Sequence, residues 1–253
     1  MNGKTAWITG AGKGIGRSLA LNLVQRGYVV AVSARSKEDL DTLANEARAG
    51  RIVAYPLDVT DEKAVDATAA RVIEDLGGLD LVVLNAGTHS ELTAAHFHMA
   101  EFNRVMGTNL TGTANCLAAL LPRMRAAKRG RIAVVSSVAG YRGLPTAGAY
   151  NASKAALIAL CEALKPELEG SGVELSLVNP GFVDTPLTRR NKFAMPFLME
   201  PDAAAEKIAD GLERGKFEIV FPWQMTVLMK LLRILPYPLF FAVTRRMVRS
   251  IGD

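Results

Sequence analysis

Short runs of β-branched and other apolar residues alternate along the chain with longer segments in which apolar residues recur every three or four positions. This spacing predicts strands in the short runs and helices in the longer segments. The predicted strands cover residues 6–8, 29–32, 52–57, 79–84, 132–135, 173–178 and 217–221. Seven strands separated by six helical segments are therefore expected.

Most of the predicted strands are continuous apolar runs instead of alternating between apolar and polar residues. Continuous hydrophobicity is typical of strands covered on both faces, and connections of helix length are typical of parallel neighbours. We therefore expect an α/β fold, a single domain built on a doubly wound parallel sheet of seven strands with helices on both faces. Residues 1–222 would form this domain, and residues 223–253 a helical extension of it.

Two of the predicted helices have recognisable first turns. Ser36 and Thr60 each stand shortly before two acidic residues and then a helical apolar pattern. A hydroxyl that accepts from free backbone N–H groups, followed by acids near the positive end of the helix dipole, is typical of a helix start. Ser36 and Thr60 are therefore the predicted N-cap residues.

The composition is that of a globular protein, with 253 residues of which 49% are hydrophobic and 22% charged. Its two cysteines, Cys116 and Cys161, form no CxxC pair, so neither a disulfide framework nor a zinc cluster is indicated. The amino terminus runs directly into a strand, without the basic and long apolar regions of a secretory signal. We therefore expect a cytoplasmic protein.

Positive charge is concentrated near the carboxyl end. From Phe221 onward, five basic residues stand against one acid, so this segment carries +4 of the formal net charge of +5; the basic residues are Lys230, Arg233, Arg245, Arg246 and Arg249. They lie among Leu, Met and Phe, not along a polar groove with aromatic residues. Nucleic acid is therefore not the expected partner.

A glycine-rich loop, TGAGKGIG at residues 9–16, follows the first predicted strand and leads into a predicted helix. Glycine lets backbone amides approach a pyrophosphate, and the N-terminus of the helix offers free N–H groups and a positive dipole end. The spacing is GxxxGxG, and the strand, loop and helix together predict a Rossmann-type cofactor site. The loop residues expected to contact the cofactor are Gly10, Gly12, Lys13, Gly14, Ile15 and Gly16.

The second predicted strand ends in Ser33-Ala34-Arg35-Ser36 without an acidic residue. An acid at this place bonds the ribose hydroxyls of NAD, whereas a cation pairs with the 2′-phosphate of NADP. Arg35, together with Lys13, therefore favours NADP(H). Asp58, after the third strand, is expected either to accept a hydrogen bond from the adenine amino group or to cap a helix.

Candidate acid–base chemistry follows the later strands. Ser137 ends the fifth predicted strand, at the sheet edge where ligands of such folds bind. Tyr150 and Lys154 are four residues apart in a helical segment and so share one helix face. A tyrosine of ordinary pKa, ~10, is a poor acid–base group at neutral pH, but a nearby ammonium stabilises its phenolate. Tyr150 is therefore the predicted acid–base residue.

With these motifs in order, and with LNAG at 84–87 and a Pro-Gly turn after the sixth strand, the chain resembles the short-chain dehydrogenases/reductases over at least residues 4–221. The resemblance implies hydride transfer between a nicotinamide and a carbonyl or alcohol carbon. Ser137 is preferred to Ser136 because it stands thirteen residues before Tyr150. The implied catalytic tetrad is Asn109, Ser137, Tyr150 and Lys154, and further cofactor contacts are implied at Asn85, Ala86, Gly87, Tyr150, Lys154, Pro180, Gly181, Val183 and Thr185.

The resemblance also implies a role for each residue. Ser137 would bond the substrate oxygen while Tyr150 gives its proton to it. Lys154 would hold the nicotinamide ribose and lower the pKa of Tyr150, and Asn109 would hold a water that relays protons to Lys154. Thr185 would hold the nicotinamide carboxamide. A homodimer or homotetramer is expected, because the helices around 108–124 and 150–168 are rich in small residues that suit close packing of subunits.

Two segments bear on the substrate. His89, His96 and His98 have no acidic or cysteine partner nearby, so we expect His89 to line the substrate mouth rather than bind a metal. Residues 188–199 occupy the place of the family's mobile lid and are apolar, with Phe193 and Phe197 among them. An apolar lid predicts an apolar carbonyl or alcohol substrate.

The tail after residue 222 departs from the family's common form. Residues 225–235 and 239–248 predict two short amphipathic helices, with Thr226, Lys230 and Arg233 on one side of the first. Neither reaches the ~18 to 20 apolar residues of a membrane span. Three interpretations remain open: the tail packs between subunits or over the active site, lies in a membrane interface with its basic side at anionic lipid, or completes the core.

Two other functions fit parts of the pattern. A redox sensor or scaffold that binds NADP(H) without turnover would not need the Tyr150 and Lys154 pair. A nucleotide-sugar epimerase or dehydratase on a related fold would carry a larger carboxyl-terminal substrate domain. The sequence therefore favours an NADP(H)-dependent carbonyl reductase or alcohol dehydrogenase.

Overall fold

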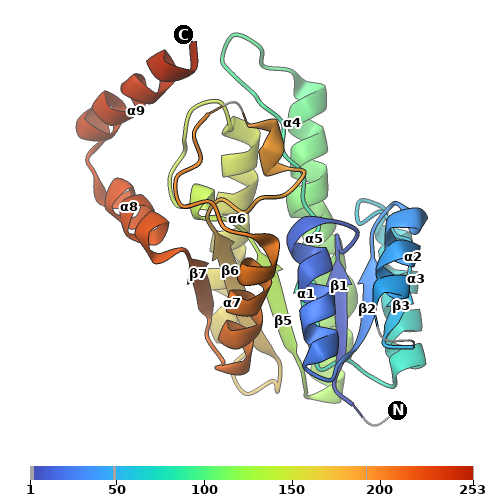
Figure 1. Ribbon diagram of the computed structural model, residues 1–253. Coiled ribbons are helices and arrows are strands. Elements are labelled where there is room, and N and C mark those ends of the chain that lie inside the picture. Colours follow the sequence, from blue (N-terminus) through green and yellow to red (C-terminus); the bar gives the residue numbers. More distant parts are fainter. Residues whose placement is uncertain (1–2, 48–49, 192, 253) are drawn as a thin grey trace.

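The computed structural model of the protein describes residues 3–47, 50–191 and 193–252, and side chains up to residue 247. Arg249 and Asp253, counted above in the charge of the tail, lie outside the described side chains. Seven parallel strands form one sheet in the order β3-β2-β1-β4-β5-β6-β7 (Figure 1). They are β1 (Thr5–Thr9), β2 (Val29–Ser33), β3 (Ile52–Ala54), β4 (Leu81–Leu84), β5 (Arg131–Val135), β6 (Glu174–Pro180) and β7 (Glu218–Phe221).

Helices cover both faces of this sheet, as the hydrophobic pattern predicts. One face is covered by α1 (Gly14–Gln25), α2 (Lys37–Glu46) and α7 (Pro201–Glu213), and the other by α3 (Glu62–Leu76), α5 (Gly112–Ala127) and α6 (Gly148–Glu167). Successive strand residues enter different cores: Ala6 and Ile8 pack under the first set of helices and Trp7 under the second. Because both faces are buried, every position of such a strand must be apolar.

The strand order reverses between β1 and β4, since β2 and β3 lie on one side of β1 and the later strands on the other. At such a switch point the loops leaving neighbouring strands diverge and open a crevice at the carboxyl edge. The glycine loop leaves β1 and the LNAG segment leaves β4, so the fold itself brings these two motifs together at this crevice.

Three details differ from the sequence prediction. Ser36 caps α2 as expected, because its Oγ accepts from the N–H of Asp39 at 3.1 Å, but the N-cap of α3 is Asp61 and not Thr60. The Thr60 hydroxyl is engaged by Asp58, so the carboxylate of Asp61 accepts from the N–H of Ala64 instead. The strand β3 is shorter than predicted. The crossover from β4 to β5 contains α4 (Met99–Met106) and α5, joined by a π-helical turn, Gly107–Thr111.

The tail forms the two predicted helices, α8 (Trp223–Ile234) beside β7 and α9 (Tyr237–Gly252), which extends away from the sheet (Figure 1). Met225, Met229 and Leu232 of α8 belong to the same core as α5 and α6. Of the polar residues predicted to share one side of α8, Thr226 is buried and Lys230 is ion-paired with Glu218 of β7. Among the described residues, no helix is both long and apolar enough to cross a bilayer.

Candidate active site

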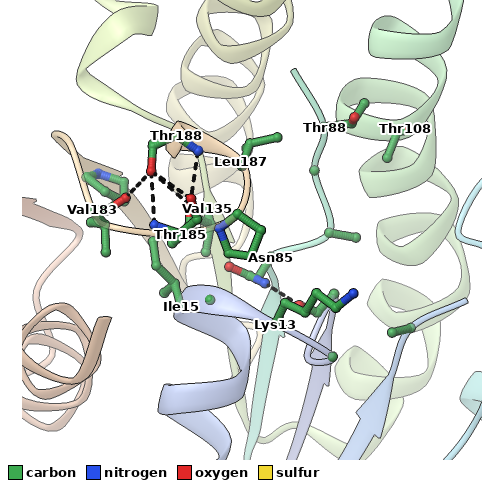
Figure 2. A pocket seen from close by; sticks show the side chains of 18 of the residues that line it. Lys13, Ile15, Asn85, Thr88, Thr108, Val135, Val183, Thr185, Leu187 and Thr188 are labelled. Atoms are coloured by element: carbon green, nitrogen blue, oxygen red, sulfur yellow. Dashed lines mark hydrogen bonds between the residues drawn. The ribbon is translucent and has the colours of Figure 1, made fainter. Parts of the chain in front are cut away.

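A cavity of about 510 Å³ opens at the carboxyl edge of the sheet, over the switch point (Figure 2). The loops after β1, β2, β4, β5 and β6 and the start of α6 form its wall. The predicted residues that line it are Gly10, Gly12, Lys13, Gly14, Ile15, Arg35, Asp58, Asn85, Ala86, Gly87, Ser137, Tyr150, Lys154, Pro180, Gly181, Val183 and Thr185. Gly16 and Asn109 do not line the cavity, but they contact residues that do: Gly16 packs against Gly10, and Asn109 is hydrogen-bonded to Thr88.

The glycine loop is held by contacts that admit no side chain. Gly14 has a φ of +56°, and a Cβ at this position would lie 2.9 Å from Cγ2 of Thr185. A Cβ on Gly16 would lie 2.5 Å from the carbonyl oxygen of Gly10. Asn85 closes the arrangement, since its Nδ2 donates to the carbonyl oxygens of Thr9 and Gly10, both at 3.1 Å. The N-terminus of α1 therefore lies at the cavity wall, in a cradle that fits the pyrophosphate of a dinucleotide.

The cavity end near β2 carries four charged groups. Arg35 is exposed there, and Nζ of Lys13 lies 3.2 Å from Oδ2 of Asp39. Asp58 accepts from the backbone N–H and the hydroxyl of Thr60, at 3.0 and 2.8 Å. Partial burial raises the pKa of this carboxyl, but the two Thr60 bonds and the charge of Arg35 outweigh it and lower the pKa. Asp58 therefore braces the turn before α3 but does not cap that helix, whose N-cap is Asp61, and its contact with the adenine stays a prediction.

The sequence analysis missed Asp39 as a wall residue of this cavity. β2 does not end in an acidic residue, but Asp39 stands four residues after Arg35, in the first turn of α2. The fold brings its side chain close to Gly12 and Lys13. Asp39 is the third residue of α2, and this helix starts beside the glycine loop. Its position in the first turn could have indicated that it faces that loop.

Ser137, Tyr150 and Lys154 meet in the middle of the cavity, with Lys154 and Tyr150 one turn apart on α6. Nζ of Lys154 donates to the carbonyl oxygen of Val135 at 2.9 Å and lies 5.6 Å from the centroid of the Tyr150 ring. Ser137 follows β5 directly; its Oγ donates to the carbonyl oxygen of Pro180 at 3.2 Å and accepts from the N–H of Ala139 at 3.1 Å. The ends of β5 and β6, together with α6, thus hold the three side chains close to one another.

The pKa values of this group are set mainly by burial. Burial raises the pKa of the Tyr150 phenol, while the Ser137 hydroxyl lowers it. Burial also lowers the pKa of Lys154 to about 8. In the protein alone, the pKa of Tyr150 is therefore raised, whereas Lys154 was expected to lower it.

Asn109 is the member of the predicted tetrad that does not line the cavity. It lies in the π-helical turn between α4 and α5, is fully buried, and has both ends of its side-chain amide bonded to protein. Its Oδ1 accepts from the N–H of Thr88 at 2.7 Å, and its Nδ2 donates to the carbonyl oxygen of Thr88 and to Oγ of Ser153. Since Oγ of Ser153 in turn donates to the carbonyl oxygen of Tyr150 at 2.8 Å, this side chain positions α6 and the loop after β4. The expected role of Asn109 in holding a water stays a prediction.

The loop after β6 closes the far side of the cavity (Figure 2). Thr185 is buried, and its N–H donates to Oγ1 of Thr188 at 3.0 Å, while the Thr188 hydroxyl donates to the carbonyl oxygen of Val183. Thr188 was not among the predicted site residues. It braces the turn that carries Thr185, the residue expected to hold a carboxamide.

A second cavity, of about 350 Å³, adjoins the first and shares Ser137 and Tyr150 with it. Its wall is mostly apolar and comes largely from the loop after β5, the lid and the tail helices; it includes Leu144, Phe182, Phe193, Met225, Leu228 and Met229. The tail therefore covers the active site, one of its three predicted positions, and also completes the core.

His89 lines this second cavity, as expected, and its ring meets the Tyr150 ring edge-on with centroids 5.1 Å apart. Its Nδ1 is buried without a hydrogen-bond partner among the described residues, and burial lowers the pKa of the ring. The imidazole is thus a neutral polar group beside Tyr150. The described residues contain no group of three His, Cys, Asp or Glu side chains that could hold a metal ion.

Comparison with known proteins agrees with this geometry. The family model for short chain dehydrogenases matches residues 4–195. An oxidoreductase of Myxococcus xanthus, itself described as uncharacterized, is 43% identical over 250 residues, 98% of either chain. A 3-oxoacyl-(acyl-carrier-protein) reductase of Thermotoga maritima is 32% identical over 219 residues, 86% of this chain and 85% of that one.

A solved structure gives the same result. A short chain dehydrogenase from Burkholderia cenocepacia in complex with NADP superposes with a TM-score of 0.80 at 27% identity, over 92% of this chain and 93% of that one. The family match, the Myxococcus relative and the fold all agree. The chain therefore belongs to the short-chain dehydrogenase/reductase family of oxidoreductases, which act on alcohol and carbonyl groups.

Proposed function

We propose that this protein is a cytoplasmic, NADP(H)-dependent oxidoreductase that interconverts the carbonyl and alcohol forms of a lipophilic substrate. The observation that carries the proposal is the meeting of the two cavities at Ser137 and Tyr150. A cofactor in the larger cavity and an apolar substrate in the smaller one would face each other across these two hydroxyls. The buried, unpaired cysteines Cys116 and Cys161 fit a reducing compartment.

The larger cavity suits a phosphorylated dinucleotide. The cradle at Gly14 and Gly16 would hold the pyrophosphate, and Lys13 and Arg35 would hold the 2′-phosphate. The Burkholderia cenocepacia neighbour is described in complex with NADP, which supports the same cofactor here. When bound, the nicotinamide supplies or accepts the hydride.

The protein's own side chains handle the proton. Because burial raises the pKa of Tyr150, its phenol keeps its proton at neutral pH and can give it to the oxygen of a carbonyl substrate. Ser137 would hold that oxygen by exchanging its long bond to Pro180 for one to the substrate. The ammonium of Lys154, fixed by Val135, would stabilise the phenolate left behind.

The smaller cavity points to the substrate class. Its apolar wall suits an alkyl or acyl chain, and neutral His89 offers one polar contact beside the reacting carbon. The Thermotoga maritima relative is named a reductase of 3-oxoacyl chains, which have a second oxygen near the reacting carbonyl. We therefore propose a carbonyl on an apolar chain, with a further polar group close to it.

The test is a series of ketones, aldehydes and 3-oxoacyl thioesters of increasing chain length, with NADPH and NADH consumption measured in parallel. Turnover relative to KM should rise with chain length until the cavity is filled, and NADPH should be preferred. The Tyr150→Phe protein is the matched control for non-enzymatic consumption. Equal activity on short polar and long apolar carbonyls would contradict the proposed substrate class, and NADPH binding without turnover of any carbonyl would favour the sensor alternative.

A further inference from the structure

Helix α8 turns an apolar face toward solvent. Trp223, Val227, Leu231 and Ile234 recur at positions i, i+4, i+8 and i+11 and so form one row, and their exposed fractions are 72%, 50%, 55% and 75%. The opposite row, which includes Met229, is buried in the core. A surface helix of a globular protein has its polar residues on the outer side. Here the outer side is apolar.

The polar residues of α8 are used against the body of the protein. Thr226 is buried and its hydroxyl donates to the carbonyl oxygen of Pro222 at 2.9 Å, and Nζ of Lys230 lies 2.8 Å from Oε2 of Glu218. The rotation of α8 about its axis is therefore fixed by these contacts and by its buried methionines. The outward position of the Trp223 row is a consequence of that rotation.

Helix α9 continues the exposed apolar surface. Among its described side chains, 237–247, only Phe240 and Thr244 are buried. We call eight of the exposed apolar side chains of the two helices the apolar tail surface; they are Trp223, Val227, Leu231, Ile234, Tyr237, Leu239, Phe241 and Val243. So many exposed apolar side chains on two successive helices, the second of which stands away from the sheet (Figure 1), mark an interaction site.

Charge determines which occupant fits. The chain has no acidic residue from 219 to 252, and Arg245 and Arg246 are exposed on α9. A second copy docked by a twofold contact would set this cationic segment against itself, with no acidic residue between 219 and 252 to pair with it. An anionic lipid surface accepts both the apolar side chains and the arginines.

We propose that the apolar tail surface binds the interface of an anionic phospholipid bilayer, with α8 and α9 lying in the headgroup region. The adjoining lid contributes the exposed side chains Phe193, Phe197 and Leu198. Leu228 and Met247 line the substrate cavity and are also exposed beside this surface. An apolar substrate would pass from the bilayer to Ser137 and Tyr150 along that wall; this delivery step rests on the proposed function, and the membrane binding does not.

The chain carries its own probe for the test. It has two tryptophans, Trp7, which is fully buried in the sheet, and Trp223, which is 72% exposed on the proposed surface. Vesicles of phosphatidylglycerol should shift the Trp223 emission to shorter wavelength, and brominated lipid should quench it. Phosphatidylcholine vesicles and high salt should weaken both effects. The Trp223→Phe protein should lose the spectral change while still sedimenting with the anionic vesicles.

Two variants and one control identify the surface. The triple change Val227→Ser, Leu231→Ser and Ile234→Ser should weaken sedimentation at least about tenfold. The pair Arg245→Gln and Arg246→Gln should weaken it by roughly 30-fold on anionic vesicles only. The control Phe97→Ser and Met99→Ser, two exposed apolar residues elsewhere, should leave it unchanged.

The outcomes also separate this proposal from the proposed function. The triple variant should turn over a short, water-soluble carbonyl at the wild-type rate, because none of its three residues lines either cavity. If vesicles of both kinds leave Trp223 emission and sedimentation unchanged, the membrane proposal is overturned whatever the activity. The same holds if the triple change dissociates an oligomer, measured by light scattering, while vesicles have no effect.

Discussion

The ammonium of Lys13 and the carboxylate of Asp39 form an ion pair, with Nζ and Oδ2 3.2 Å apart, in the wall of the larger cavity beside Arg35. Lys13 comes from the glycine loop and Asp39 from the first turn of α2, so the pair joins two segments that both face the adenosine end of a bound dinucleotide. A 2′-phosphate there would compete with Asp39 for Lys13. Cofactor preference should therefore depend on all three charges.

Changing these charges should move cofactor preference in opposite directions. Arg35→Asp should lower the ratio of NADPH to NADH affinity by on the order of 10², through lost pairing and new repulsion, whereas Asp39→Asn should raise it by freeing Lys13. Fluorescence titration with each cofactor measures both ratios. Equal affinity of the unchanged protein for NADPH and NADH would refute the assignment.

Tyr150→Phe removes the proposed proton donor while keeping the ring that His89 contacts. The turnover number for carbonyl reduction should fall by about 10² or more, the scale of a positioned acid–base group. NADPH affinity and Tm should stay near the values of the unchanged protein. Retained turnover would place the proton donor at another residue.

The stability of the protein alone should depend on pH through Lys154. Burial lowers its pKa from 10.5 to about 8, so between these values the unfolded chain holds a proton that the folded chain has lost. The unfavourable effect of burying the charge is complete below about pH 8 and disappears as pH rises toward 10.5. The free energy of unfolding of the native protein, measured against Lys154→Met in urea, should therefore rise from pH 8 to 10. A constant difference would show that folding leaves the pKa of Lys154 unchanged.

Arg142 stabilises the connection between α8 and α9. Its guanidinium donates to the carbonyl oxygens of Arg233 and Leu235, at 3.2 and 3.3 Å, and lies over the rings of Tyr237 and Phe240. Arg142→Ala should speed amide hydrogen exchange in α9 and raise KM for long-chain substrates several-fold, since Met247 of α9 lines the substrate cavity. KM for a short carbonyl should not change. Arg129→Ala, on the opposite edge of the sheet, is the control.

Oligomerisation is expected through α5 and α6, whose outward sides carry alanines. Ala152, Ala155, Ala159 and Ala163 are exposed on α6, and Ala114 and Ala118 on α5. Side chains this small allow helices of twofold-related subunits to approach closely. Light scattering should show a dimer or tetramer at micromolar concentration, and Ala155→Arg with Ala159→Arg should give monomers. A monomeric native protein would contradict this expectation.

The sequence by itself determined the parallel sheet of seven strands and its helical crossovers. It also identified the glycine loop and Ser137, Tyr150 and Lys154. These features are local: strand burial requires continuous hydrophobicity, the loop requires glycine at fixed spacing, and four residues place Tyr150 and Lys154 on one face of α6. Each follows from a short stretch of chain, so its spacing is visible without the fold.

Tertiary structure alone decided the partners of those residues. Asn109 is hydrogen-bonded to Thr88 and Ser153, and Asp39 is ion-paired with Lys13. These residues are far apart in the sequence, so no repeating pattern along the chain indicates that they meet. The orientation of α8 was decided in the same way. That helix is apolar on two sides, so its pattern shows which residues share a face but not which face meets the protein; Glu218 and the core around Met229 select one, and the Trp223 row is left outside.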